Sequence, residues 1–339
     1  MGKNHNALES EIAELHACKH GIAVNSGTDA LRIMMDAAGI GAGDEVITTA
    51  FTFVASTETI VQTGARPVFV DIEEDTFQID PGLIEAAITP RTRAILPIHL
   101  FGQICDMSTI MPIAEKHGLM VLEDAAQAIG AKQNGTPAGA FGLAGAFSFY
   151  VTKNLGAAGD GGMIVTSSDD IAERCRSMRI HGMGRERYYY DHLGYTSRLA
   201  EIQAAVLRVK LTRLQDWNVR RREIAAIYNR GLAGTNLKLP VTPAGNETTW
   251  HQYTVLSNRR DELQAFLKDR GIGSMIYYPV PLHFHEPYSR LGFGKGDLPV
   301  TERACRTCPS LPVHQNLTDE QARFVTESIR EFSGSAVSV

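Results

Sequence analysis

Residues 145–163 read Gly-Ala-Phe-Ser-Phe-Tyr-Val-Thr-Lys-Asn-Leu-Gly-Ala-Ala-Gly-Asp-Gly-Gly-Met and carry a single lysine, Lys153. A short apolar run, Ala146 to Val151, precedes this lysine, and a second run, Met163 to Thr166, follows a glycine-rich loop. Because glycine has no Cβ, its backbone can approach a ligand closely. The stretch therefore predicts two strands joined by a loop that presents one amine to a bound molecule. The alternative is an ordinary exposed loop lysine.

Further apolar runs alternate with segments of helical length before this stretch. They are Val46–Thr48, Val68–Val70, Ala94–Leu96 and Met120–Leu122. Strands spaced by helices predict an α/β domain with a mostly parallel central sheet. Such sheets bind ligands at the carboxyl ends of their strands. Glu123 and Asp124 follow one of these runs directly, so we expect them at that edge.

Helical segments flank the predicted sheet on both sides in the sequence. Leu8, Ile12 and Leu15 form one apolar stripe, and Gly21 is expected to end that helix. Residues 199–230 contain no Gly or Pro and predict one long helix or two nearly continuous ones, stopped by Gly231. Within them, three successive arginines at 220–222 point in different directions and predict a solvated face.

Pro240, Pro243 and Gly245 mark a plausible domain boundary. Beyond them, strand-like runs such as Tyr253–Val255 alternate with charged helical segments such as Asp261–Arg270. We therefore predict a large domain over residues 1–240 and a smaller α+β domain over residues 241–339.

Composition limits the classes of function that the chain could serve. Its 339 residues, 44% of them hydrophobic, are enough for a sizeable core, and the formal net charge is −5. This charge gives no electrostatic reason to expect nucleic acid or an anionic membrane as a partner. Five scattered cysteines do not form a secreted disulfide framework, and the first residues include no signal-peptide h-region. We expect a soluble cytoplasmic protein.

A small polar turn, Asn25-Ser-Gly-Thr-Asp29, opens a second helical stripe. Free N–H groups at the positive end of a helix dipole can receive a phosphate, although an ordinary N-cap is the alternative interpretation. If Lys153 carries an aldehyde cofactor as a Schiff base, a pyridine nitrogen needs a carboxylate partner, for which Asp124 is placed. Gly27, Thr28 and Ser148 could then bind the phosphate, and Phe53 could cover the ring.

Several motifs occur together and in order along nearly the whole chain. They are Asn25-Ser-Gly-Thr-Asp-Ala-Leu31, Thr52-Phe-Val-Ala55, Pro97-Ile-His-Leu-Phe-Gly-Gln103, Glu123-Asp-Ala-Ala-Gln-Ala-Ile-Gly-Ala131, Ser148-Phe-Tyr-Val-Thr-Lys-Asn-Leu-Gly156, Gly194-Tyr-Thr-Ser-Arg198, Glu201-Ile-Gln-Ala-Ala205, Trp250-His-Gln-Tyr253 and Tyr277-Tyr-Pro279. In this order and spacing the sequence resembles the DegT/DnrJ/EryC1/StrS family of sugar aminotransferases. The resemblance implies the aspartate aminotransferase fold (fold type I) and the cofactor pyridoxal 5'-phosphate.

The resemblance also implies roles for individual residues. Lys153 is implied as the Schiff-base lysine and proton shuttle, and Asp124 as the partner of the ring nitrogen. The remaining cofactor contacts that it implies are Gln127 near the phenolic oxygen, Phe53 and Ala126 on the two ring faces, and Gly27, Thr28 and Ser148 around the phosphate. In the family a second subunit sends an asparagine to that phosphate. Thr196 stands at this position here, and its hydroxyl has a shorter reach.

The implied reaction moves an amino group from an amino acid, expected to be glutamate, to a keto group on a nucleotide-linked sugar. The implied assembly is a homodimer with active sites at the interface. Relatives usually carry a further stretch of residues before the helix that begins near Ala7, where it helps to form the substrate entrance. The resemblance therefore implies either a truncated chain or an altered substrate site here. Two alternatives are a sugar dehydratase, in which relatives replace the lysine by histidine, and a cofactor-binding regulatory protein without turnover. We expect no metal site, because Cys305, Cys308 and His314 lack a fourth ligand.

Overall fold

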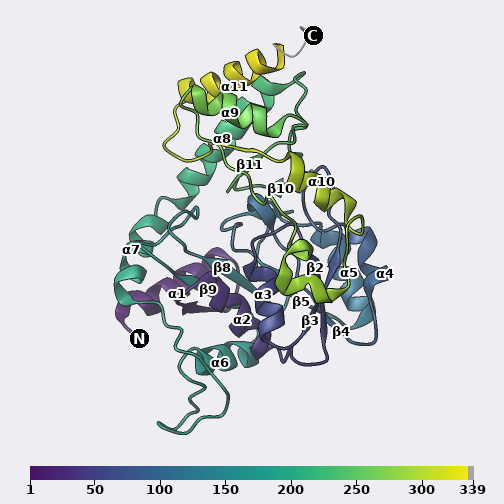
Figure 1. Ribbon diagram of the computed structural model, residues 1–339. Helices are drawn as coiled ribbons and strands as arrows, with labels where there is room; N and C mark the ends of the chain where they lie inside the picture. Colours follow the sequence, from purple (N-terminus) through teal and green to yellow (C-terminus); the bar gives the residue numbers. More distant parts are fainter. Residues whose placement is uncertain (335–339) are drawn as a thin grey trace.

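A seven-stranded sheet lies at the centre of the computed structural model, which describes residues 1–334 (Figure 1). The strand order is β1-β9-β8-β5-β4-β2-β3. The bounds are β1 His20–Val24, β2 Glu45–Thr49, β3 Arg66–Val70, β4 Thr92–Ile95, β5 Met120–Asp124, β8 Ala144–Ser148 and β9 Gly162–Thr166. All neighbouring pairs are parallel except β9 with β8 and with β1. The predicted α/β fold with a mostly parallel sheet is confirmed.

Helices cover both faces of this sheet, as a buried parallel sheet requires. One face packs against α2 (Gly27–Ala37), α3 (Ala55–Gln62) and α6 (Asp169–Met178). The other packs against α1 (Lys3–Leu15), α4 (Ile84–Ala87), α5 (Met107–His117) and α7 (Glu201–Leu211). Successive strand side chains point to opposite faces, so Leu122 joins the first layer and Val121 the second. The alternation of side chains along each strand therefore determines which residues belong to each layer.

The opening helix α1 forms where the apolar stripe predicted it, with Leu8 and Ile12 fully buried. It ends at Leu15, and Ala17 takes a left-handed φ of 52°. Gly21 lies inside β1, so the prediction that it ends the helix is wrong. The turn is made by residues that sequence rules for helix ends do not favour.

Residues 199–230 form two nearly continuous helices, α7 and α8 (Leu214–Leu232), as predicted. The prediction that Gly231 stops α8 is wrong, because the helix includes it. A Cβ at this position would stand 2.6 Å from Thr326 Cγ2 on α11 (Asp319–Gly334). Glycine here serves the close approach of two helices rather than a helix end.

The second half of α8 belongs to a separate core with the C-terminal elements (Figure 1). This core includes Ile224 and Tyr228 of α8 and residues of α9 and α11. The remaining elements are α9 (Arg260–Asp269), α10 (Pro299–Thr307), the pair β11 (Tyr253–Thr254) and β12 (Ser310–Leu311), and a small sheet of β6 (Lys132–Gln133), β7 (Thr136–Pro137) and β10 (Asn246–Glu247). Since α8 reaches into both parts, the predicted boundary at residue 240 stays a prediction.

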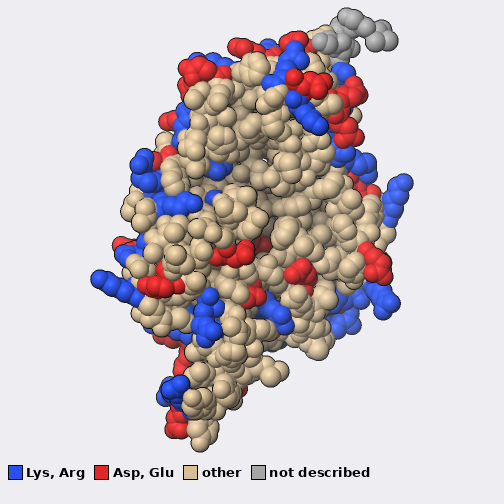
Figure 2. Space-filling model, turned by 60° about the vertical axis from the view of Figure 1, so that its left-hand side comes forward, with Lys and Arg blue, Asp and Glu red and all other residues tan. Residues whose placement is uncertain are grey.

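The surface seen in Figure 2 mixes charges of both signs, with blue and red side chains interspersed around a mostly uncharged middle. Within residues 1–334, no helix combines the length and apolar character needed to cross a bilayer.

Candidate active site

A cavity of about 510 Å³ lies at the carboxyl ends of the parallel strands. Its volume falls in the range of roughly 300–1,000 Å³ that small-molecule sites occupy. Eight predicted site residues line it: Gly27, Thr28, Phe53, Asp124, Ala126, Gln127, Ser148 and Lys153. The structure thus brings these residues together around one space, while the role of each stays a prediction.

Lys153 reaches the cavity from the turn that follows β8, where its backbone N–H donates to the Tyr150 carbonyl at 2.8 Å. Burial lowers the pKa of its amine from 10.5 to about 8, and the nearby Asp124 carboxylate partly opposes this shift. Such a pKa leaves about a tenth of the amine neutral at pH 7, because the pKa lies about one unit above that pH. A neutral amine is the nucleophilic form.

Asp124 ends β5 and is held by both of its carboxylate oxygens. Oδ2 accepts a hydrogen bond from Ser56 Oγ at 2.7 Å, and Oδ1 accepts one from the Ala126 N–H at 3.1 Å. Ser56 in turn lies 3.1 Å from Thr52 Oγ1. Asp124 is 4% exposed and lines the cavity, so these bonds fix the position of its carboxyl group there. Such a carboxylate can stabilise a positive charge on a bound ring.

Glu123 precedes Asp124 and points to the other face of the strand. Its Oε2 lies 2.9 Å from His99 Nε2 and accepts the Gly139 N–H, while Oε1 accepts the N–H groups of Phe141 and Gly142. Glu123 therefore braces the loop before β8 instead of lining the cavity.

The N-terminus of α2 forms one wall of the cavity. Ser26 is the N-cap, and its Oγ accepts the Asp29 N–H at 3.1 Å. Gly27 and Thr28 follow as the first helical residues, whose N–H groups point out of the helix. A Cβ on Gly27 would stand 2.6 Å from Ser148 Cβ, so glycine lets the helix end meet β8. This wall suits a phosphate, because helix N-termini attract anions.

Gln127 and Phe53 occupy different parts of the cavity. Gln127 Oε1 accepts the Phe101 N–H at 2.8 Å, and Nε2 donates to the Tyr278 hydroxyl at 3.1 Å. Phe53 is 55% exposed and presents an apolar ring at the open side. A planar ligand could lie between this ring and Ala126.

Thr196 does not line the cavity. It lies after the 183–192 segment, opposite Ile180, and its Oγ1 is 3.1 Å from His181 Nε2. Because the predicted contact of Thr196 is with the phosphate site of a second subunit, it stays a prediction.

Sequence reasoning assigned no site role to several polar side chains that line the cavity, among them Ser56, His99, His251 and Tyr278. His99, His251 and Tyr278 lie within quoted motifs, which indicated their position but not their role. Ser56 carried no signal of its own.

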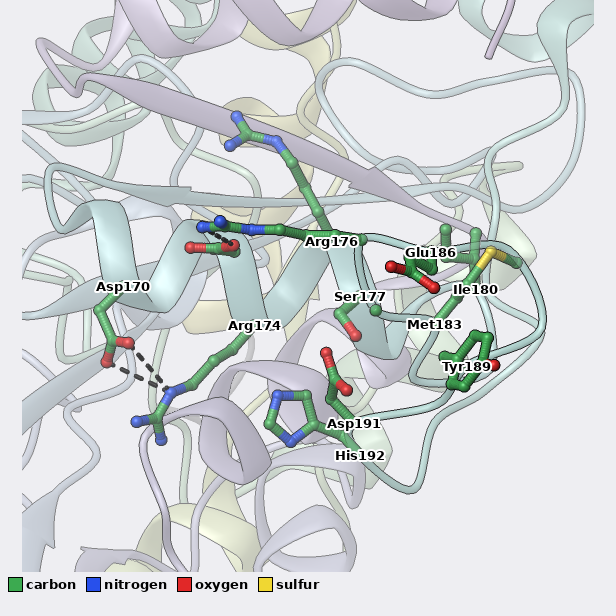
Figure 3. A pocket seen from close by; sticks show the side chains of 13 residues that line it. Asp170, Arg174, Arg176, Ser177, Ile180, Met183, Glu186, Tyr189, Asp191 and His192 are labelled. Atoms are coloured by element: carbon green, nitrogen blue, oxygen red, sulfur yellow. Dashed lines mark hydrogen bonds and ion pairs between the residues drawn. The ribbon is translucent and has the colours of Figure 1, made fainter.

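A second and wider hollow, of about 830 Å³, lies between α6 and the 183–192 segment. Figure 3 shows Arg174 directed towards Asp170, with Met183 and Tyr189 on the opposite side. None of the predicted site residues lines it. Over residues 1–334, no group of three or more His, Cys, Asp or Glu side chains is placed to hold a metal ion.

Comparison with known families and proteins gives consistent matches over the whole chain. The model of the DegT/DnrJ/EryC1/StrS aminotransferase family matches residues 1–330. A pleiotropic regulatory protein of Geobacillus stearothermophilus is 51% identical, covering 98% of this chain and 90% of the relative. A UDP-N-acetyl-3-dehydro-alpha-D-glucosamine 3-aminotransferase of Acidithiobacillus ferrooxidans is 45% identical, covering 97% and 89%.

Solved structures also resemble the chain over nearly its whole length. S. venezuelae DesV, in complex with a ketimine intermediate, has a TM-score of 0.96 at 45% identity, covering 98% of this chain and 90% of that one. The PLP-form of Spr1654 from Streptococcus pneumoniae, a putative sugar aminotransferase, has a TM-score of 0.93 at 27% identity, covering 100% and 93%. Spr1654 has also been solved in an apo-form.

Proposed function

The chain belongs to the DegT/DnrJ/EryC1/StrS aminotransferase family, and from this premise we propose that it aminates the keto group of a nucleotide-linked sugar, with glutamate as amino donor. It is a pyridoxal-phosphate-dependent aminotransferase. The substrate class is supported by relatives such as the UDP-sugar 3-aminotransferase. The observation that carries the proposal is that Lys153 and Asp124 face one cavity.

The side chains present fit the cofactor. A reactive amine, a fixed carboxylate and a helix N-terminus surround one space of about 510 Å³. Pyridoxal phosphate supplies an aldehyde and an electron-accepting ring. Lys153 would hold the aldehyde end and move protons at Nζ, and Asp124 would keep the ring nitrogen protonated. Gly27, Thr28 and Ser148 would bind the phosphate.

A regulatory role is the second candidate, since the Geobacillus stearothermophilus relative carries a regulatory name. Lys153 disfavours the dehydratase alternative, because the family resemblance implies a histidine at this position in a dehydratase. The low pKa of Lys153 supports chemistry at this amine rather than mere cofactor storage.

The working assembly in this proposal is a cytoplasmic homodimer. Large apolar side chains stay exposed beside the cavity and along α7: Phe53 at 55%, Tyr150 at 49%, Val151 at 52%, Ile202 at 71% and Val209 at 73%. Apolar groups gathered in this way favour association. In this proposal the second copy covers these side chains, and Thr196 contacts the phosphate site of that copy.

The test combines cofactor trapping with turnover. The protein loaded with pyridoxal phosphate should be yellow, and borohydride should fix the chromophore to the peptide that contains Lys153. Lys153→Met should take up no label. Lys210→Met is the matched control, because its amine contacts the Gly156 carbonyl in the same loop. Label on another lysine would contradict the assignment.

Glutamate-dependent amination is then measured across a panel of UDP- and dTDP-linked keto-sugars. Turnover of at least one member is expected. Labelled Lys153 without turnover of any sugar would favour the regulatory candidate.

A further inference from the structure

The side chain that follows the cavity lysine in the sequence is tied into a buried network. This residue, Asn154, belongs to the lysine turn (residues 150–157) and is 4% exposed. Its Nδ2 donates to the Thr249 carbonyl and to Asn218 Oδ1, each at 3.0 Å. Its Oδ1 lies 3.1 Å from His251 Nδ1. The oxygen and the nitrogen of this amide therefore both have partners, and these partners lie outside the turn itself.

Asn218 contributes to this network from α8 and is 1% exposed. Its Nδ2 donates to the Ile129 carbonyl at 3.1 Å, while its Oδ1 accepts the hydrogen bond from Asn154. Because backbone carbonyls can only accept, the Ile129 and Thr249 carbonyls determine which end of each amide carries the nitrogen. The backbone around the two side chains thus fixes the direction of the hydrogen bond from Asn154 to Asn218.

The backbone beside Ile129 leaves space for this side chain. Gly130 has a left-handed φ of 79°, and a Cβ at this position would stand 2.9 Å from Asn218 Nδ2. A residue with a side chain would be strained there and would crowd the amide. A glycine in the segment after β5 is therefore what allows Asn218 to reach the carbonyl of Ile129.

The same face of α8 also holds the segment that accepts from Asn154. Arg221 lies three residues after Asn218, a spacing that places two side chains on one face of a helix. Arg221 is 5% exposed, and its Nη1 donates to the Trp250 carbonyl at 3.0 Å. Through this face, α8 is bonded both to the lysine turn and to the 249–251 segment.

We propose that Asn218 is a positioning residue, which fixes the lysine turn through Asn154 and so sets the point from which the Lys153 side chain enters the cavity. Lysine has a long and flexible side chain, so fixing its backbone limits the positions that the amine can reach. A displacement of about 1 Å can lower the rate of a catalysed reaction about 100-fold. The purpose of this positioning rests on the proposed function, whereas the contacts do not depend on it.

Two substitutions of Asn218 separate the lysine side of the network from the remainder. Asn218→Leu is similar in size and removes both hydrogen bonds of the side chain. Asn218→Asp keeps an oxygen that can accept from Asn154 but loses the amide donor to Ile129. If Asn218 acts through Asn154, the Asp variant should resemble wild type in the properties of the lysine turn, and the Leu variant should not.

The first measurement is hydrogen exchange of the 150–157 segment in the cofactor-free full chain, read by mass spectrometry. Asn218→Leu should accelerate exchange of this segment about 10-fold, equivalent to about 1.4 kcal/mol, because the turn opens locally more often. Asn218→Asp should exchange at the wild-type rate.

The second measurement follows pyridoxal phosphate as it joins Lys153. The rate of the change in visible absorbance should fall about 10-fold or more in Asn218→Leu, because the amine is held in place less well. The induced circular dichroism of the bound cofactor should also weaken, since the ring is oriented less rigidly. Borohydride followed by peptide mapping confirms that the cofactor is on Lys153. Asn218→Asp should match wild type in both properties.

Tyr228→Phe is the matched control, because Tyr228 is buried on the same helix and donates to the Pro312 carbonyl at 2.6 Å, away from the lysine turn. It loses a buried hydrogen bond of α8 and should leave both measurements at their wild-type values. Wild-type values in Asn218→Leu, or the same changes in Asn218→Leu and Tyr228→Phe, would overturn the proposal. Equal changes in the Leu and Asp variants would also overturn it, because the effect would then not pass through Asn154.

Nuclear magnetic resonance of the wild-type protein provides a test that holds even if Asn218→Leu does not fold. Asn154 Nδ2 donates to two acceptors, so the side-chain amide should exchange slowly with water, and rapid exchange would refute the network. The exchange measurements need neither cofactor nor sugar. Failure to aminate any keto-sugar would therefore leave the assignment of Asn218 standing, and failure of that assignment would leave the aminotransferase proposal untouched.

Discussion

Replacing Lys153 by Met should alter how the stability of the cofactor-free protein depends on pH. The native fold lowers the pKa of this lysine from 10.5 to about 8. At 1.36 kcal/mol for each pKa unit, the folded state disfavours the ammonium by about 3.4 kcal/mol at neutral pH. This figure is an upper limit for the gain on substitution, because Asp124 loses a favourable neighbour in the variant.

The sign follows from proton counting. Between pH 8 and 10.5 the unfolded wild-type chain binds more protons at this lysine than the folded chain does. The free energy of unfolding of wild type should therefore rise with pH in this window, whereas the variant lacks that contribution. From pH 7.5 to pH 9.5 the wild type should gain about 2 kcal/mol relative to Lys153→Met.

Urea unfolding followed by far-ultraviolet circular dichroism at pH 7.5, 8.5 and 9.5 measures this difference. Lys295→Met, at an exposed lysine, is the control and should follow wild type at all three values. A wild-type minus Lys153→Met difference that is constant across the series would refute the lowered pKa of Lys153.

Three further substitutions test the walls of the cavity. Asp124→Asn should retain pyridoxal phosphate, seen by its absorbance, but lower kcat for amination at least about 100-fold, because the neutral amide cannot keep the ring nitrogen protonated; unchanged turnover would remove Asp124 from this role. Ser56→Ala loses the 2.7 Å hydrogen bond to Asp124 and should lower the free energy of unfolding by about 1.5–3 kcal/mol. The control Ser10→Ala, at an exposed position of α1, should lower it by about 0.5 kcal/mol or less. Urea unfolding measures both values. Gly27→Ala places a Cβ 2.6 Å from Ser148 Cβ and should weaken the binding of pyridoxal phosphate about 10-fold or more, as measured by fluorescence titration. The control Gly273→Ala has open space around its Cβ and should bind the cofactor as wild type does. Equal cofactor affinities of the two variants would contradict the close approach of Gly27 to Ser148.

The sequence was sufficient for the parallel strands of the sheet, because each contains a short run of buried apolar residues. It also predicted that Lys153 and Asp124 would meet, since both follow strands that end on one edge. Those predictions rest on local pattern and on one topological rule. The contact of Gln127 with Tyr278 spans 151 residues, and no periodicity within either segment indicates it.

Arg221 shows the same limit on a helix. Three successive arginines predicted a solvated face, yet Arg221 is 5% exposed and donates to the carbonyls of Trp250 and Val313. The expectation was wrong for this residue, because helical spacing shows which side chains share a face but not which face the C-terminal elements will cover. The prediction that α8 ends at Gly231 was wrong for a related reason. The glycine is needed there for the close approach of Thr326, which is a tertiary contact.

The span of α8 has a consequence for any attempt to shorten this protein. A fragment that stopped at residue 240 would still contain the amine and the carboxylate, but it would lack Thr249, His251 and Tyr278, which hold the lysine turn and Gln127 in place. It would also expose the apolar side chains of Ile224 and Tyr228, which pack in one core with the C-terminal elements. Residues beyond 240 thus hold part of the cavity wall in place, and we expect a fragment of residues 1–240 to lack activity.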